Sequence, residues 1–329
     1  MINDLDALEL EDKLEAVEQI LSAASTGHRD VIDQLTGHLA NAGGKRLRPV
    51  LASICAYLGP NPNEPNIVKA AAVVELTHLA SLYHDDVMDS APTRRGAPSA
   101  QHLWGNNRAI LAGDVLFAEA SKLGADLGPE SVRRHATSFV RMCTGQLNES
   151  FGPDEGDSPV EFYIQVLADK TGALVAEAAA MGALHSGASP ELIEIVEAFG
   201  EKIGVAFQIA DDVIDLDSSA DVTGKTPGTD LREGVDTLPI LLLKQQADEG
   251  LIDSAGTEIL NALAAKDLND DGELEAVVDA IRSHPVLDET RRLAAKWADD
   301  AVTELDGLPD GRAKEGLLVF ARLMVDRQA

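Results

Sequence analysis

The chain has 329 residues, of which 56 are Asp or Glu and 27 are Lys or Arg, so its formal net charge is −29. A surface this acidic repels phosphate backbones, and general nucleic-acid binding is therefore disfavoured. Hydrophobic residues form 45% of the chain, which is enough for a sizeable core and excludes global disorder.

Apolar residues recur at three- and four-residue intervals along most of the chain, and this spacing predicts helices. The clearest segments, in chain order, are Leu5–Leu21, Ile67–Val87, Val160–Leu184, Leu192–Leu216 and Leu287–Leu305. Alternating runs of β-branched residues, which would predict strands, are missing. The composition does not shift along the chain, and no segment is typical of an interdomain linker. We therefore expect an all-α fold of about a dozen helices, forming a single domain over residues 1–329.

The N-terminal segment, MINDLDALELEDKLE, has no basic region followed by an apolar stretch, so it is not typical of a signal peptide. No run approaches the roughly 18 apolar residues that a membrane span requires. These features predict a cytoplasmic protein without a membrane span.

Two segments carry the pattern Asp-Asp-x-x-Asp, and each comes at the end of a strongly apolar helical segment. The motif residues are Asp85, Asp86 and Asp89 in the first segment and Asp211, Asp212 and Asp215 in the second. Ionised carboxylates at such positions lose hydration without an obvious gain. The motifs therefore indicate a bound ligand.

Helical geometry gives a reason for this spacing. Asp85 and Asp89 lie on one face of a helix, as do Asp211 and Asp215, because residues i and i+4 stack. Like charges placed in this way destabilise a helix unless a divalent cation lies between them. A small number of hard oxygen ligands suits Mg²⁺, which keeps several waters and is completed by substrate phosphate oxygens. Two such helix ends facing one another would hold Mg²⁺ ions with a diphosphate between them.

Basic residues gather on both sides of the first motif. The run Gly-Gly-Lys-Arg-Leu-Arg-Pro, which begins at Gly43, places three cations beside a glycine pair that exposes backbone N–H groups, and Thr93–Gly96 adds two arginines. Cations beside flexible backbone donors suit the recognition of a diphosphate. Within the first run, we interpret Arg46 as a surface charge.

Other polar residues are candidates for the same ligand. Lys170, Thr171 and Lys225 offer further donors. From spacing alone, His78 is either a ligand contact or a packed core residue, since it lies two helical turns before the first motif on nearly the same face. Gln208, just before the second motif, is either a ligand contact or a polar residue at a helix junction.

The segment Ser218–Asp236 is rich in Gly and Pro and predicts no regular structure. A loop of this length in a compact domain is generally functional, and its composition is typical of a mobile lid.

Taken together, these segments resemble the trans-type polyprenyl diphosphate synthases. The blocks GGKRLRP, HDDVMDSAPTRRG, GNNRAILAGD, KTGALVAEAA, FQIADDVID and GKTPGTDLREGVDTLP occur in the order of that family, from Gly43 to about Pro239. The segment LDGLPDGRAKEGLLVFARLMVDR is similar to the C-terminus of family members. The resemblance implies an all-helical isoprenoid-synthase fold around a central substrate cavity, a homodimer and three Mg²⁺ ions.

The resemblance also implies roles at the matched positions. Metal ligation would fall to Asp85, Asp89, Asp211 and Asp215. The wider catalytic set would be Asp85, Asp86, Asp89, Arg94, Lys170, Asp211 and Asp212. Within it, Asp86 and Asp212 would either ligate metal or hold the metal-ligating residues in place. The same two roles are open for Asp215. The allylic diphosphate would be bound by Arg94, Lys170, Thr171, Gln208 and Lys225. Isopentenyl diphosphate would be bound, without metal, by Gly44, Lys45, Arg48, His78 and Arg95.

The implied reaction condenses isopentenyl diphosphate head-to-tail with an allylic diphosphate. Mg²⁺ and cationic side chains neutralise the allylic leaving group, so that its C–O bond ionises to an allylic cation. The double bond of isopentenyl diphosphate attacks this cation, and a proton is then lost to the released diphosphate. No side-chain nucleophile is required.

Product length is expected to depend on the side chains beneath the first motif. Ser81 and Ala80, four and five residues before Asp85, are small, whereas short-chain family members carry bulky aromatics there. The side chains one turn deeper are not aromatic either: Leu76, Thr77 and Val73. We favour a product of six or more isoprene units over geranylgeranyl diphosphate.

Two alternatives stay open. A class I terpene cyclase shares the fold and the first motif, although its second metal motif is normally of an Asn/Ser/Glu type. A non-catalytic helical partner subunit of a heterodimeric synthase would be expected to have eroded motifs, whereas both are intact here. One departure from the family is Thr229, where some members have a second Lys, so one candidate phosphate contact is lost.

Overall fold

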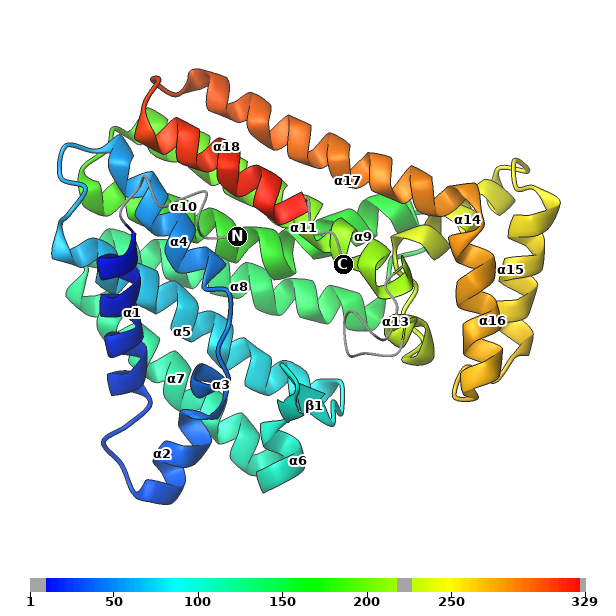
Figure 1. The fold of residues 1–329 in the computed structure, drawn as a ribbon, viewed down its shortest axis with the longest axis horizontal. Helices are drawn as coiled ribbons and strands as arrows, with labels where there is room; N and C mark the ends of the chain where they lie inside the picture. The colour runs from blue at the N-terminus through cyan, green and yellow to red at the C-terminus, as the bar shows by residue number, and fades with distance from the viewer. Residues whose placement is uncertain (1–9, 218–226, 326–329) are drawn as a thin grey trace. The chain divides into compact units, whose positions relative to one another are not determined.

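The computed structural model describes residues 10–217 and 227–325. These residues are helical along almost their whole length (Figure 1), and their only strands are the short pair β1 (Thr93–Arg94) and β2 (Ala97–Pro98). The all-α prediction is confirmed. Within the same residues, no helix is both long and apolar enough to cross a membrane.

The helices up to the second aspartate motif are α1 (Glu11–Ala24), α2 (Asp30–Thr36), α3 (His38–Asn41), α4 (Leu47–Cys55), α5 (Pro65–Met88), α6 (Ala100–Trp104), α7 (Asn106–Asp126), α8 (Pro129–Phe151), α9 (Pro159–Leu167), α10 (Ala173–Ser186) and α11 (Pro190–Asp217). Those that follow are α13 (Thr229–Arg232), α14 (Leu238–Asp248), α15 (Ser254–Ala265), α16 (Asp271–Arg282), α17 (Pro285–Glu304) and α18 (Arg312–Val325). Three short turns of tighter or wider helix are η2 (Ala56–Leu58), η3 (Ala168–Gly172) and η4 (Leu305–Gly307).

The chain divides into two compact units. The first comprises Met1–Val140, Leu174–Gly200 and Glu304–Phe320. The second comprises Arg141–Ala173, Glu201–Thr303 and Ala321–Ala329. Each unit has its own apolar core. The single domain expected from the sequence stays a prediction.

The first unit is built around α5. This helix is apolar on every side, because α1, α4, α6 and α7 pack against it and bury residues from Ile67 to Tyr83. α7 approaches most closely at Gly113, where a Cβ atom would lie 2.5 Å from Nε2 of His84. The scaffold therefore surrounds the helix that carries the first aspartate motif.

The second unit has a core in which α9, α14, α15, α16 and α17 contribute side chains together with the C-terminal half of α11. Leu167, Ile209, Leu238 and Ile281 are among its buried members. The second aspartate motif follows this apolar part of α11, so each unit carries one motif on its own buried helix.

The predicted helical segments agree with the structure where it describes them; Leu5–Leu21 is described only from Leu10, and its helix α1 begins at Glu11. Two details differ. The segment Val160–Leu184 is not one regular helix, because the π-helical turn η3 separates α9 from α10. The predicted lid, Ser218–Asp236, is described only from Pro227, where a turn leads into the short helix α13. Residues 218–226, and with them Lys225, lie outside the described residues.

Candidate active site

The first aspartate motif lies at the C-terminal end of α5. Asp85 is partly buried in the last turn, and Asp89 is exposed at the residue that ends the helix. Ser90 follows with φ 52°, and the N–H of Ala91 donates to the carbonyl of Asp86 at 3.0 Å, which is the Schellman form of helix termination. Backbone hydrogen bonds therefore fix the geometry of this helix end. Asp85 and Asp89 lie one helical turn apart on it.

The middle aspartate of this motif is turned away from solvent. The side chain of Asp86 is fully buried, and its Oδ1 accepts a hydrogen bond from Nε of Arg94 at 2.6 Å. Its Oδ2 has no hydrogen-bond partner within the described chain. Burial raises the pKa of Asp86, although the charge of Arg94 opposes this effect. Asp86 therefore holds Arg94, a predicted diphosphate-binding residue, at the end of α5.

Arg94 and Arg95 come from a hairpin that follows α5. Its two turn residues, Arg95 and Gly96, have φ of 54° and 76°, as a two-residue type I′ hairpin requires. Nη1 of Arg95 donates to the carbonyl of Gly43. A Cβ atom on Gly44 would lie 3.0 Å from the same Nη1, so a glycine is needed for this approach. The hairpin is thereby joined to the loop that is predicted to bind isopentenyl diphosphate.

The sequence-based interpretation of Arg46 as a surface charge is wrong. Its side chain is only 10% exposed, and Nη1 donates to Oε1 of Glu75 on α5 at 3.1 Å. Nε and Nη2 donate to the carboxylate of Glu18 on α1, and Nη2 also donates to the carbonyl of Ala40 at 3.0 Å. Arg46 has φ 50°, in the left-handed region. It therefore fixes the loop before α4 to two other helices.

His78 lies on α5 and is surrounded by positive charge. Its pKa is lowered well below the usual value, first by burial and then by the charges of Arg48, Arg95, Arg46 and Arg94. The ring is therefore neutral at pH 7. Arg46 and Arg94 are ion-paired with Glu18, Glu75 and Asp86. The positive charge that is left to favour an anionic ligand near His78 therefore comes chiefly from Arg48 and Arg95.

Arg48 supplies a more direct sign of a ligand in this region. Its Nε is buried and has no hydrogen-bond partner within the described chain. Burial and the charge of Arg95 lower the pKa of Arg48, whereas Glu75 raises it. A buried donor without an acceptor costs free energy, and an oxygen of an anionic ligand would satisfy it. Lys45, three residues before Arg48, is exposed.

The second aspartate motif lies in the last two turns of α11. Asp211 is partly buried, and Asp212 is only 6% exposed. Oδ2 of Asp212 accepts hydrogen bonds from the hydroxyl of Tyr163 at 3.0 Å and from the N–H of Leu238 at 3.3 Å. Burial raises the pKa of Asp212 well above its usual value, although both hydrogen bonds oppose this effect. Asp212 therefore joins α9 and the start of α14 to α11.

Asp215 is bound to the segment that follows residue 226. Its Oδ1 accepts from the N–H of Thr229 at 3.3 Å, and its Oδ2 accepts from the N–H of Asp230 at 3.4 Å. The carbonyl of Asp215 accepts from the N–H of Gly228 at 2.9 Å. Asp215 thus holds the start of α13 to the end of α11. Its ligation of metal stays a prediction.

The π-helical turn η3 carries Lys170 and Thr171, both partly buried. Such a wide turn is uncommon within helices and frequent at functional sites. Nζ of Lys170 forms an ion pair with Glu149 of α8. α8 presents Gly145 to this turn, where a Cβ atom would lie 2.9 Å from Cβ of Asp169 and 3.0 Å from the backbone nitrogen of Lys170. A glycine on α8 therefore permits the turn that displays Lys170.

Gln208 is partly buried on α11, one turn before Asp211. The described residues contain no group of three or more His, Cys, Asp or Glu side chains that could hold a metal ion unaided. Each motif instead offers a pair of carboxylates one helical turn apart, which fits a cation that takes its other ligands from water and a diphosphate. The two motifs belong to different units, so their facing one another stays a prediction.

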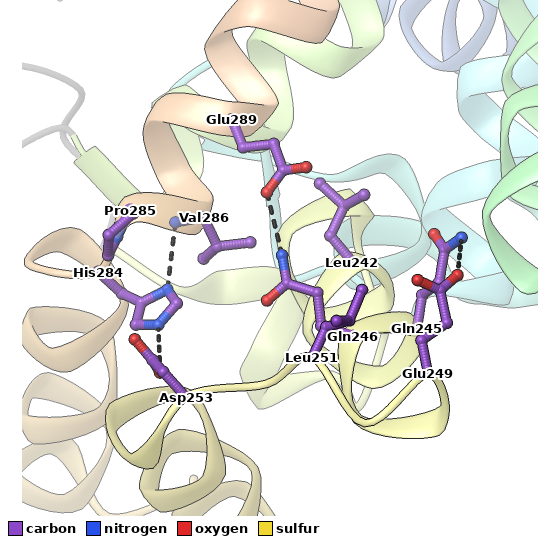
Figure 2. Close-up of a pocket in the computed structure, with 10 residues that line it drawn as sticks. All are labelled: Leu242, Gln245, Gln246, Glu249, Leu251, Asp253, His284, Pro285, Val286 and Glu289. Carbon is purple, nitrogen blue, oxygen red and sulfur yellow. Dashed lines mark hydrogen bonds and ion pairs between the residues drawn. The ribbon is translucent and has the colours of Figure 1, made fainter.

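The second unit also contains a pocket between α14, the segment after it and the start of α17 (Figure 2). His284 donates from Nε2 to Asp253 at 3.1 Å, and its Nδ1 accepts from the N–H of Val286 at 3.1 Å. Gln246 donates to Glu289 across the pocket at 3.1 Å. None of the predicted site residues lines this pocket, and these polar groups bind one another, so it is not part of the candidate active site.

Two residues that organise the site were missed in the sequence analysis. Glu75 pairs with Arg46 over 29 positions, and Tyr163 binds Asp212 over 49 positions. The one available signal was Glu75 itself, a carboxylate within the apolar run of α5, since a buried charge requires a partner. Tyr163 gave no such signal, because a tyrosine on a helix is ordinary.

An all-helical chain with two aspartate-rich helix ends and a cluster of arginines beside one of them defines an enzyme that acts on isoprenoid diphosphates. Comparisons with known proteins agree. The family model described as polyprenyl synthetase matches residues 29–281. The chain is 43% identical over 311 residues to the nonaprenyl diphosphate synthase of Mycobacterium tuberculosis, covering 94% of this chain and 91% of the relative.

Two further relatives support the same assignment. The heptaprenyl diphosphate synthase component 2 of Geobacillus stearothermophilus is 34% identical over 321 residues, 97% of each chain. The geranylgeranyl pyrophosphate synthase of Corynebacterium glutamicum, solved with calcium and isoprenyl diphosphate, superimposes with a TM-score of 0.85 at 40% identity, covering 98% of this chain and 97% of that one. The chain belongs to the polyprenyl synthetase family and is a prenyltransferase.

Proposed function

We propose that this enzyme condenses isopentenyl diphosphate with an allylic diphosphate to give a trans-polyprenyl diphosphate. The observation that carries this proposal is the buried Nε of Arg48, which has no hydrogen-bond partner within the described chain, in the region where Arg94 and Arg95 lie beside the end of α5. A strongly acidic protein that gathers cations at one helix end does so to bind an anion. The aspartates beside the cluster suit a divalent cation, which a diphosphate can share.

The loop before α4 and the hairpin after α5 supply the binding site for isopentenyl diphosphate. Gly44, Lys45, Arg48 and Arg95 provide donors, and the unpartnered Nε of Arg48 is the sharpest support for a bound oxygen. His78 is neutral, so it offers one N–H donor without adding charge to the four arginines. This site requires no metal.

The allylic diphosphate binds through Arg94, Lys170, Thr171, Gln208 and Lys225, together with divalent cations held by Asp85, Asp89, Asp211 and Asp215. Mg²⁺ is the expected ion, since carboxylate pairs in small number suit this hard cation. The resemblance to the family implies three such ions. When bound, Mg²⁺ neutralises the departing diphosphate. Asp86 holds the binding residue Arg94 in place, whereas Asp212 holds Tyr163 and the backbone of Leu238 beside the second motif.

The side chains then act by charge and position. Arg94 and Lys170 stabilise the negative charge that develops on the leaving diphosphate as the allylic C–O bond breaks. Arg48 and Lys45 hold isopentenyl diphosphate so that its double bond meets the allylic carbon. The predicted lid, of which residues 218–226 lie outside the described residues, would exclude water from the cation until a proton is lost to the released diphosphate.

The product is geranylgeranyl diphosphate or longer. Ala80 is fully buried and Ser81 partly buried on α5, and both side chains are small, so neither offers the bulky floor of a short-chain member. The sequence favours six or more isoprene units, because no aromatic residue follows within the next turn.

A homodimer in the cytoplasm is the expected form. Leu111 of α7 is 61% exposed and Val140 of α8 is 63% exposed in the single chain. Phe117 and Phe139 bring these two helices into contact, with ring centroids 4.6 Å apart. Large apolar side chains on adjoining helices are typical of a surface that a second copy covers. Sedimentation analysis should give the mass of two chains, and Leu111→Glu should shift it toward one.

The decisive experiment is incubation of the purified chain with Mg²⁺, radiolabelled isopentenyl diphosphate and farnesyl diphosphate. We expect longer prenyl diphosphates, and no product when a chelator removes the metal. A cyclic hydrocarbon formed from farnesyl diphosphate alone would indicate a terpene cyclase instead. Elongation that requires a second polypeptide would indicate a partner subunit of a heterodimeric synthase.

A further inference from the structure

Three helices of the first unit bring polar side chains together at one level. Thr77 of α5 is fully buried, and Glu177 of α10 is 2% exposed. His135 of α8 lies between them: its Nδ1 is 2.9 Å from Oε1 of Glu177, and its Nε2 is 3.4 Å from Oγ1 of Thr77. The side chain of His135 is itself only 12% exposed. We call these three residues the crossbar.

The hydrogen bonds give the crossbar a direction. Oγ1 of Thr77 donates its hydrogen to the carbonyl of Val73 at 2.9 Å, so toward His135 it acts as an acceptor. Nε2 of His135 is therefore the donor to Thr77. On its other side, the ring binds the carboxyl group of Glu177. The crossbar thus links α5, α8 and α10 through one continuous set of polar contacts.

The surroundings make this cluster unusual. Glu177 lies in the most alanine-rich helix of the chain, and its neighbours Ala176 and Ala178 to Ala180 are all buried. Oε2 of Glu177 has no hydrogen-bond partner within the described chain. Replacing buried charged or polar pairs by apolar side chains of similar volume is often neutral or stabilising. Stability alone is therefore a poor explanation for the crossbar.

Its position suggests another explanation. Thr77, Ser81 and Asp85 follow one another at intervals of four residues along α5. The crossbar therefore lies about 12 Å from Asp85 along the helix axis, two turns below the aspartates. In the proposed function, the diphosphate is held at Asp85, and the prenyl chain extends down α5 past Ala80 and Ser81. The crossbar is the next feature along that path.

We propose that the crossbar is the stop that sets product length. This inference rests on the proposed function. An apolar chain that grows past Thr77 must separate His135 from Glu177, and it offers neither of them a hydrogen bond in return. The small side chains at positions 80 and 81 admit the chain, and the contacts from α8 and α10 then end its growth. The preference for a product of six or more isoprene units rests on the small side chains of α5 alone. A stop at the crossbar favours a product shorter than that.

The experiment compares products of the wild-type chain and of the double variant His135→Ala/Glu177→Ala, which removes both hydrogen-bond partners together. Each is incubated with Mg²⁺, farnesyl diphosphate and excess isopentenyl diphosphate, and the products are separated by chain length. We expect the main product of the variant to be longer by one isoprene unit or more. Consumption of isopentenyl diphosphate during the first turnovers should stay within about threefold of wild type.

A matched control is available on the same two helices. His185 of α10 contacts Ser131 of α8, with Nε2 and Oγ 2.9 Å apart. Ser131 lies four residues before His135 on α8, and His185 lies eight residues after Glu177 on α10, so this pair joins the same two helices away from the crossbar. His185→Ala should therefore leave product length unchanged, whereas a merely structural role of the crossbar predicts that both variants behave alike.

The outcomes separate this inference from the proposed function. An unchanged product distribution in a folded, active double variant overturns the crossbar and leaves the synthase activity intact. Absence of elongation by the wild-type chain overturns the proposed function itself. If circular dichroism shows that the double variant does not fold, His135→Ala is tested in the same way, and a longer product supports the crossbar while an unchanged one overturns it.

Discussion

The ends of α5 and α11 carry the same Asp-Asp-x-x-Asp pattern, but the structure uses the two copies differently. In both, the middle aspartate is buried and its pKa is raised by burial. Asp86 is bound by the charged side chain of Arg94, whereas Asp212 is bound by a tyrosine hydroxyl and a backbone N–H. At the end of α5 the buried aspartate therefore binds a charged arginine, which is predicted to bind a diphosphate. At the end of α11 the buried aspartate binds only neutral donors.

The third aspartates differ as well. Asp89 is exposed just past the end of α5, whereas Asp215 accepts hydrogen bonds from two N–H groups at the start of α13. The second helix end is thus tied to the segment that continues from the predicted lid. The comparison teaches that one motif positions Arg94, which is predicted to bind substrate, and the other positions the segment from Gly228 to Asp230.

The largest effect on turnover is expected from Asp85 and Asp211, the first aspartates of the two motifs, which are both predicted to bind metal. Asp85→Ala and Asp211→Ala should each lower turnover by about 10³-fold or more, because each removes a carboxylate that would bind the divalent cation. Initial rates of isopentenyl diphosphate incorporation measure this loss, and circular dichroism should show unchanged helicity. Near-normal turnover in either variant would contradict the metal assignment for that end.

Removal of Arg94 should lower the stability of the chain, because the carboxylate of Asp86 at the end of α5 is buried. Arg94→Ala leaves Asp86 buried without its cation, which we expect to cost about 3 kcal/mol in the free energy of unfolding. Urea denaturation measures this cost. In the matched variant Asp86→Asn/Arg94→Ala the buried charge is absent, so most of the stability should return while activity stays low. If the double variant is as unstable as the single one, the buried charge is not the cause.

The second end should respond to pH. The pKa of Asp212 is higher in the folded chain than in the unfolded chain, so its contribution to stability is present at low pH and is lost as pH rises through the folded pKa. Asp212→Asn keeps an oxygen for Tyr163 and Leu238 but cannot ionise. From pH 4 upward, its stability relative to wild type should rise, by about 1 kcal/mol in total.

Urea denaturation at a series of pH values tests this behaviour. Asp279→Asn, at an exposed carboxylate of α16, is the control and should follow wild type at every pH. A constant difference between Asp212→Asn and wild type would mean that Asp212 does not titrate as its burial requires.

The last prediction concerns product length rather than turnover, and it tests the part of α5 that precedes the first motif. Ala80→Phe adds a bulky ring to the fully buried face of α5, five residues before Asp85, and should shorten the main product by narrowing the path of the growing chain. Product chromatography measures the change, and Ala72→Phe, which is also buried but lies farther along α5, provides a comparison. An unchanged distribution for Ala80→Phe would place the path elsewhere.

Local sequence was sufficient for the helices and for the position of both motifs at helix ends. The periodicity of Ile67–Val87 and Leu192–Leu216 specified α5 and α11, because buried helices need apolar residues on every face. The hairpin residues Arg94 and Arg95 were also identified, since a basic run directly after the first motif is visible in the sequence.

The partners of these residues could not be predicted from local sequence. Arg46 was interpreted as a surface charge because nothing near it indicates Glu18 or Glu75, each more than 25 positions away. The π-helical turn at Lys170 has no composition signal, because it depends on the approach of Gly145 from another helix. Periodicity specifies which face of a helix is buried, but not which side chains from other elements pack against that face.

Gly145 has a consequence for engineering this enzyme. The place of Lys170 depends on the absence of a methyl group on a neighbouring helix, so even alanine at position 145 would push the lysine outward without altering any charged residue. A library that randomises the surroundings of Lys170 to change the accepted primer should therefore keep this glycine, and vary the larger side chains that border it.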